Sequence, residues 1–399
     1  MLKRIYDMIF RRRETELERR NARNVSTVSF LLGFTDSFYA YVLSVYFAEV
    51  LGSDNVGVFY LVSYGVIFGL LWFLHRIMRK IGGSILTFFL TILAGVVLAV
   101  TLSVVSVGWP GAVLAVFLLI VVNLGWVSLD VALEQVSDDG VTGRVRGLYL
   151  TVMNAGVLLA PFFATRVIDT FGFGGVFFGV TLGLALVLAV SIVLLRNCSD
   201  CSSVRMEVRS AWRKMLQEPN LFHIYNVAFG LGFFYLIMMI YTPIHLLELG
   251  FSWEEIGILF TIMLLPFVFL QYPLGILADK RFGEKEFLLV SIAVAAMATL
   301  SFGLFTSKSL LFWGVLLFIS RIGAAGIEVL RDSYFYKHVE GDDDDLITFF
   351  RTAYPAANIV GAVIATPTLF FFPLQSVFVL ATAVLLFSFY SALRIKDTR

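Results

Sequence analysis

The sequence predicts an all-α integral membrane protein in which twelve transmembrane helices form two pseudo-symmetric six-helix bundles. The first observation behind this fold class is composition. Of the 399 residues, 59% are hydrophobic and only 15% are charged, whereas a soluble domain carries about 25% charged residues. The second is a series of long apolar runs along the chain, and the third is an internal repeat that relates its two halves.

Twelve apolar runs are each long enough to cross a bilayer core of about 30 Å, which takes about 20 helical residues. They lie near 25–50, 56–76, 83–106, 110–135, 145–168, 173–195, 220–248, 253–277, 286–306, 309–335, 346–371 and 374–394. Several connections are very short, for example Gly108–Pro110 and Gly250–Trp253. Such connections make consecutive spans antiparallel neighbours.

Polar segments divide the chain into five parts. A charged N-terminal segment over 1–23 precedes the first bundle at 24–196, and a polar linker over 197–219 leads to the second bundle at 220–394 and a short tail at 395–399. The N-terminal segment carries an apolar stripe between basic residues. That pattern favours an interfacial helix on anionic headgroups over the alternative of a regulatory docking arm.

The linker at 197–219 holds both cysteines of the chain, Cys198 and Cys201. Two cysteines are too few for a disulfide framework, and a metal site would need two further ligands that the segment lacks. We expect reduced, unpaired thiols, and no metal or cofactor is predicted. The net charge of +1 gives no global field that would favour nucleic acid as a partner.

The distribution of basic residues predicts the orientation. If the N-terminus is cytoplasmic, that face receives all of the 30 Lys and Arg residues except Arg166, Lys308 and Arg321. Because cytoplasmic loops are enriched in Lys and Arg, both termini are expected in the cytoplasm. The expected location is a prokaryotic inner (plasma) membrane.

The two halves repeat with an offset near 200 residues, which is a signature of internal duplication. Val56-Gly57 matches Ile256-Gly257. The acidic pair Asp130 and Glu134 matches Glu328 and Asp332, with each pair on one helical face at i,i+4. Equal spacing also relates three residues of the fifth span to three of the eleventh: Arg146, Tyr149 and Gly156 to Arg351, Tyr354 and Gly361.

The turn at Gly275–Lys285 reads Gly-Ile-Leu-Ala-Asp-Lys-Arg-Phe-Gly-Glu-Lys. It resembles the loop signature of the major facilitator superfamily of transporters, with one extra residue before the second glycine. The resemblance implies two six-span halves, a central cavity lined by spans one, four, seven and ten, and a monomer. It also implies a latch in which Asp279, beside Arg281, faces the start of span five near 144–147, with Arg331 as a further partner.

Two ionisable residues near the middle of spans are candidates for the substrate or coupling site, because charges within a membrane are costly. Asp36 in span one suits proton coupling or cation binding, and a structural hydrogen-bonded role is equally compatible with the sequence. Arg321 in span ten remains charged and needs a carboxylate or an anionic substrate. An Asp36–Arg321 pair is therefore one hypothesis. Further candidates are Tyr39, Asn123, Asn226, Tyr235 and Tyr241.

Charged residues at the cytoplasmic ends of the spans suggest a gate. Salt bridges among them would close the cytoplasmic side and break when the halves rock, and a proton relay is the alternative. The gate candidates besides Asp279 and Arg281 are Asp130, Glu134, Arg146, Glu328, Arg331, Asp332 and Arg351.

The chain has no phosphate-binding loop and no hydrolase motif, so we expect a transporter and not an enzyme. The leading hypothesis is a proton-coupled secondary transporter working by alternating access, an exporter of amphiphilic compounds. An importer of a polar anionic or zwitterionic metabolite is the first alternative. The second is a transporter-like sensor or lipid-handling protein without solute flux. The expected partners are the lipid bilayer, a small-molecule substrate and protons.

Overall fold

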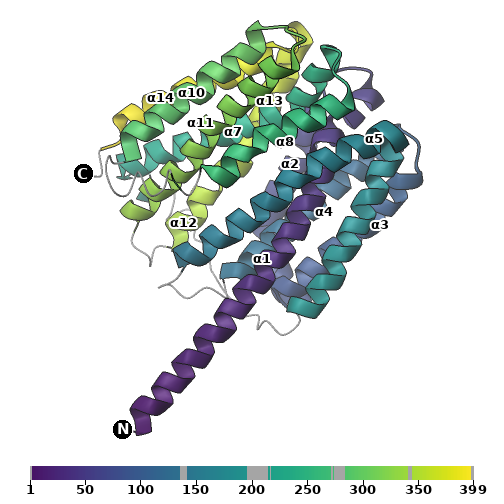
Figure 1. Ribbon diagram of the computed structural model, residues 1–399. Helices are drawn as coiled ribbons and strands as arrows, with labels where there is room; N and C mark the ends of the chain where they lie inside the picture. The colour runs from purple at the N-terminus through teal and green to yellow at the C-terminus, as the bar shows by residue number, and fades with distance from the viewer. Residues whose placement is uncertain are drawn as a thin grey trace.

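The computed structural model describes residues 2–134, 142–195, 214–215, 217–270, 273, 284–339 and 344–396. Helices make up nearly all of this part of the chain and form two bundles, one from each half of the sequence (Figure 1). The first half contains α1 (Leu2–Leu51), α2 (Gly57–Ile81), α3 (Ser84–Val104), α4 (Trp109–Glu134) and α5 (Thr142–Leu195). The second contains α7 (Pro219–Glu248), α8 (Trp253–Phe269), α10 (Glu284–Leu304), α11 (Leu310–His338), α12 (Asp344–Arg351), α13 (Ala353–Phe371) and α14 (Ser376–Arg394).

As far as the structure describes the chain, each predicted span falls on a helix, with two differences in how the helices are divided; residues 274–277 of the eighth span lie outside the described residues. The fifth and sixth spans both belong to α5, where Gly172 interrupts the helical backbone with φ 63° and ψ −163°. Glycine tolerates this positive φ because it lacks a Cβ atom, so the chain reverses without a loop. The eleventh span is divided at Thr352 into α12 and α13. Within the described residues, nine helices are long and apolar enough to cross a membrane.

The N-terminal segment is helical, and its position along the membrane surface stays a prediction. Residues 2–22 continue the first span as one helix, α1, which projects away from the bundles (Figure 1). The expected helix lying along the membrane surface would need a bend near residue 23. No glycine or proline occurs before Gly33, so the sequence offers no residue that favours such a bend.

The connections between helices define two sides of the molecule. The side where α1 enters and α14 ends is called here the terminal side, and the opposite side, with the α1–α2, α7–α8 and α13–α14 connections, is called the far side. On the terminal side each half is tied at its ends by an asparagine. Asn24 donates to Leu194 O at 3.1 Å, and Asn220 Oδ1 accepts from Lys396 N at 3.0 Å.

A buried charge network closes the terminal side of the second half. Glu284 at the start of α10 is fully buried and accepts hydrogen bonds from Ser333 at 3.0 Å and from Lys337. The next residue, Lys285, donates to Ile395 O at 2.8 Å, and this bond holds the chain end against the bundle. The network joins α10 and α11 to the segment that follows α14.

Candidate functional site

The two halves touch on the far side through glycines at the starts of α2 and α8. A Cβ atom added at Gly57 would fall within 3.0 Å of Thr366 Oγ1 on α13 and 3.1 Å from the Tyr241 hydroxyl on α7. Thr366 is itself fixed, because its hydroxyl donates to Ala362 O at 2.7 Å. Only a residue without a side chain allows α2 to approach α13 this closely.

The repeat-related contact has the same chemistry. A Cβ atom at Gly257 on α8 would fall within 3.0 Å of Thr165 Oγ1 on α5 and 3.4 Å from Pro161 O. The Thr165 hydroxyl donates to Pro161 O at 2.9 Å. Gly57 and Gly257 are 200 residues apart, and each meets a back-bonded threonine of the opposite half. We call these two contacts the glycine–threonine pairs.

Aromatic residues extend both contacts along the same interface. Tyr41 of α1 packs on Phe260 of α8 with ring centroids 4.7 Å apart. At the Gly57 contact, Tyr241 of α7 lies near Tyr60 of α2, and both rings are fully buried. At the edge, Arg166 of α5 forms an exposed ion pair with Glu254 of α8 at 3.5 Å. The halves are therefore in contact on the far side.

Arg321 of α11 lies beneath these contacts. Its side chain is buried, with 3% exposure, and its guanidinium lies over Phe234 at 5.0 Å and near Tyr235 at 5.8 Å. Tyr41 and Tyr354 also lie near it. Its Nη1 has no hydrogen-bond partner among the described residues. A buried cation is thus framed by aromatic rings and keeps a free donor.

Asp36 of α1 is engaged by a residue that the sequence analysis did not single out. Trp126 Nε1 of α4 donates to Asp36 Oδ2 at 3.2 Å, and Tyr39 lies beside the same carboxylate. Among the ion pairs of the described residues, none joins Asp36 to Arg321, so the hypothesised pair is not formed. Trp126 is one helical turn before Asp130, and this i,i+4 spacing to a candidate on α4 was the signal available in the sequence.

The remaining gate candidates of α11 lie between Arg321 and the terminal side. Glu328 accepts a hydrogen bond from the Tyr235 hydroxyl at 3.2 Å. One turn further, Arg331 pairs with Asp332 at 3.2 Å and also donates to Ala228 O at 3.4 Å. Side chains become more exposed in this direction: Glu328 is half-buried, and Tyr354 is 43% exposed. The exposure of the site residues therefore increases towards the terminal side.

A charge contact between the halves lies near the terminal-side ends of these helices. Arg351 at the end of α12 lies within electrostatic range of Asp130 on α4, which brings together gate candidates from opposite halves. The side chains of Glu134 and Arg146, and the turn that carries Asp279 and Arg281, lie outside the described residues. The latch around Asp279 therefore stays a prediction.

Three polar candidates do not join the central group. Asn123 of α4 donates to Leu119 O of its own helix at 2.8 Å. Tyr241 lies at the far-side contact, and Asn226 lines a separate groove between α7, α13 and α14. The central group thus comprises Asp36, Tyr39, Tyr41, Trp126, Tyr235, Arg321, Glu328 and Tyr354, from α1, α4, α7, α11 and α13.

Comparisons with known proteins agree with this architecture. A crystallised transporter of the POT family in complex with 5-aminolevulinic acid superposes with a TM-score of 0.75 at 12% identity, covering 93% of this chain and 95% of that chain. The nucleoside transporter NupG gives 0.71 at 14% identity, with 94% and 100% covered. A bacterial homologue of the human lysosomal transporter Spinster, inward-facing and unoccupied, gives 0.69 at 13% identity, with 95% and 98% covered. At these identities the likeness shows the fold alone.

The sequence comparisons identify the family. The uncharacterised MFS-type transporter YfkF of Bacillus subtilis (strain 168) is 30% identical over 107 residues, a match that spans 27% of this chain and 27% of that relative. The sequence profile of the Major Facilitator Superfamily matches residues 120–329 and 246–399, well over half of the chain. The chain therefore belongs to the Major Facilitator Superfamily and is a multi-pass membrane transporter.

Proposed function

We propose that this transporter moves an amphiphilic solute that carries an anionic group, and that Arg321 binds the anion. The observation that carries the proposal is the free Nη1 donor of a guanidinium that is only 3% exposed. A buried donor without a partner costs about 1–3 kcal/mol, and a charge within a membrane span needs a counter-charge. A carboxylate or phosphate meets both needs, since the planar guanidinium binds such groups through two parallel hydrogen bonds.

The surroundings of Arg321 favour a solute with an apolar or aromatic body. Phe234 and Tyr235 lie against the guanidinium, and Tyr41 reaches it from the other half. Tyr41 and Tyr235 are half-buried and offer stacking surfaces for the solute, whereas the fully buried Phe234 gives cation–π stabilisation to the arginine. A strongly hydrated inorganic anion would leave these apolar faces without a contact, so we favour an organic anion.

Transport would proceed by alternating access around this site. In the proposed cycle the far side is closed by the glycine–threonine pairs while the solute reaches Arg321 from the terminal side. With both termini in the cytoplasm, as the distribution of Lys and Arg suggests, this is a cytoplasm-facing state. Loading from the cytoplasm is consistent with export, the direction that we propose.

Asp36 is the proposed proton-coupling residue. Its carboxylate is the acidic group of α1 in the central group, and Trp126 donates to one of its oxygens. Protonation would remove the charge to which the indole N–H donates and would loosen the contact between α1 and α4. Proton binding would thereby be linked to the arrangement of the first half.

A matched pair of probes tests the anion site. We expect benzoate to raise the thermal stability of the purified protein, and the isosteric neutral benzamide to leave it unchanged. The shift should disappear in Arg321→Gln and return in part in Arg321→Lys, which keeps the charge but not the planar geometry. An equal response of the wild type and Arg321→Gln to benzoate would refute the assignment.

A separate observation supports a second class of solute, the zwitterions. Glu328 and Asp36 place carboxylates in the same central group as Arg321, so a zwitterion could engage both signs. Phenylalanine serves as the probe, and stabilisation by phenylalanine but not by benzoate would favour this class. Counterflow of the labelled, stabilising probe in proteoliposomes then tests transport, since a sensor without flux would show none.

A further inference from the structure

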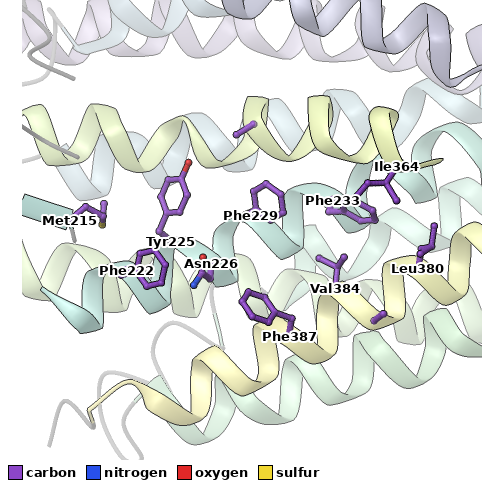
Figure 2. A pocket seen from close by; sticks show the side chains of 12 residues that line it. Met215, Phe222, Tyr225, Asn226, Phe229, Phe233, Ile364, Leu380, Val384 and Phe387 are labelled. Atoms are coloured by element: carbon purple, nitrogen blue, oxygen red, sulfur yellow. The ribbon is translucent and has the colours of Figure 1, made fainter. Parts of the chain in front are cut away.

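An open groove lies between α7, α13 and α14 in the second half. Although α13 and α14 are consecutive, they touch each other little, and each packs against α7 instead. The space between them is a cavity of about 530 Å³ with α7 as its floor (Figure 2). Phe387 on one rim is 55% exposed and Ile364 on the other is 37% exposed, so the groove opens at the surface of the bundle.

The groove has the length and character of an acyl-chain site. Its floor runs from Phe222 to Phe233 on α7, a distance of about 16 Å at 1.5 Å per residue. One leaflet contributes about 15 Å of hydrocarbon. The lining is almost wholly apolar, and the small side chains of Ala356 and Ala383 leave space between the two walls. The part of the floor beyond Asn226 is about 10 Å long, so it would hold roughly two thirds of an acyl chain of the terminal-side leaflet.

A polar side chain interrupts the apolar lining near its terminal-side end. Asn226 lies between Phe222 and Phe387 (Figure 2). Its backbone carbonyl accepts from Ser388 at 3.3 Å, and its half-buried side-chain amide lines the groove. An amide at membrane depth requires a partner. Lipid ester carbonyls lie at this boundary of the hydrocarbon region and would accept its N–H groups.

A basic residue follows at the mouth of the groove on the terminal side. Tyr390 and Arg394 continue the groove-lining face of α14 at three and seven residues beyond Phe387. Arg394 donates to the exposed Tyr390 hydroxyl at 2.8 Å and lies over its ring at 5.1 Å. Arg394 is exposed and places a positive charge at this end of the groove, which suits an anionic headgroup.

We propose that this groove is a binding site for an anionic glycerophospholipid of the terminal-side leaflet. One acyl chain lies along α7, the ester region meets Asn226, and the phosphate lies at Arg394. The apolar floor, the amide of Asn226 and the basic side chain of Arg394 follow one another in the order in which a phospholipid presents the groups that they would contact.

The site adjoins the proposed solute site through α7. Phe233 lines the groove, whereas the next residue, Phe234, lies against Arg321. The bound lipid would therefore pack on the turn of α7 that also holds the guanidinium. The groove and the anion site are nonetheless on different faces of this helix, and lipid binding does not depend on the identity of the solute.

Native mass spectrometry of the full chain, titrated with phosphatidylglycerol or with phosphatidylcholine of the same acyl chains, tests the proposal. We expect one site that prefers phosphatidylglycerol by about fivefold or more, the discrimination that one basic residue provides. Arg394→Gln should bring the two affinities together without weakening phosphatidylcholine. Phe229→Trp, which fills the groove, should remove the tight site for both lipids.

A second groove supplies the matched control. The space between α8 and α11, about 350 Å³, is lined only by apolar residues, among them the exposed Val315. Val315→Trp should leave the preference for phosphatidylglycerol intact. Equal wild-type affinities for the two lipids would overturn the proposal, as would a tight site that survives Phe229→Trp. Displacement of phosphatidylglycerol by benzoate would also overturn it, because the groove would then belong to the solute pathway.

Discussion

Substituting alanine at Gly257 or at Gly57 should open the far side of the transporter. Each added methyl group would fall within 3.0 Å of a threonine hydroxyl of the opposite half, a separation that real Cβ atoms essentially never show. The threonines have little freedom to yield. Thr165 would have to break its 2.9 Å hydrogen bond to Pro161 O, and its Cβ would also be 3.1 Å from the new methyl group.

The magnitude follows from the cost of such overpacking, which is about 1–3 kcal/mol for each added methyl group in a packed interface. The cost applies only to the state in which the halves touch on the far side. Because the open state avoids it, the equilibrium between the two states should shift by about 5- to 150-fold towards far-side opening. The two substitutions should act alike, since the contacts are repeat-related.

Double electron–electron resonance measures this shift. Spin labels at Ser106→Cys and Lys308→Cys, in a background with Cys198→Ser and Cys201→Ser, report the separation of exposed far-side loops of the two halves. Gly257→Ala should increase the population at the longer distance. Gly65→Ala is the matched control, because no atom lies within 4 Å of a Cβ atom added there. Unchanged distance distributions for both Gly57→Ala and Gly257→Ala would refute the role of the glycine–threonine pairs.

Three further predictions follow from contacts described above. Arg166→Ala should change the same far-side distances little, because an exposed ion pair such as Arg166–Glu254 contributes about 0–1 kcal/mol. A shift as large as that of Gly257→Ala would show that the ion pair matters as much for far-side closure as the glycine–threonine pair does. Asp36→Asn should abolish the dependence of counterflow on a pH gradient while the thermal shift with benzoate persists, and retained pH dependence would remove Asp36 as the coupling residue. Glu284→Ala should lower the thermal unfolding temperature in detergent, since it deletes a buried acceptor of charge-assisted hydrogen bonds from Lys337 worth about 1.5–3 kcal/mol; an unchanged unfolding temperature would show that the network contributes nothing.

The fold was largely predictable from the sequence because the bilayer imposes a strict length on apolar segments. Within the described residues each expected span coincides with a helix, and the repeat offset near 200 anticipated the equivalence of Gly57 and Gly257. The way in which the spans are joined or divided into helices was harder to predict from the sequence. Gly172 reverses the chain by a single backbone conformation, and periodicity does not distinguish such a turn from a longer loop.

The partners of the site residues were harder to predict than their positions. Asp36 and Arg321 were both identified as charges within spans, yet the pairing between them is not formed. Asp36 bonds to Trp126, and Arg321 lies among aromatic rings. Sequence patterns locate a residue along its helix and on one face. They do not fix the rotation of neighbouring helices, which decides whether two side chains on different spans meet.

The two glycine–threonine pairs give the contact between the halves an approximate two-fold symmetry. The start of the second span in each half meets the fifth span in the other, as in a two-fold symmetric dimer. The contacts of such an interface do not require the linker that joins the two halves. A chain divided within residues 197–213 would therefore keep both contacts. We expect two separately expressed halves to reassemble through them.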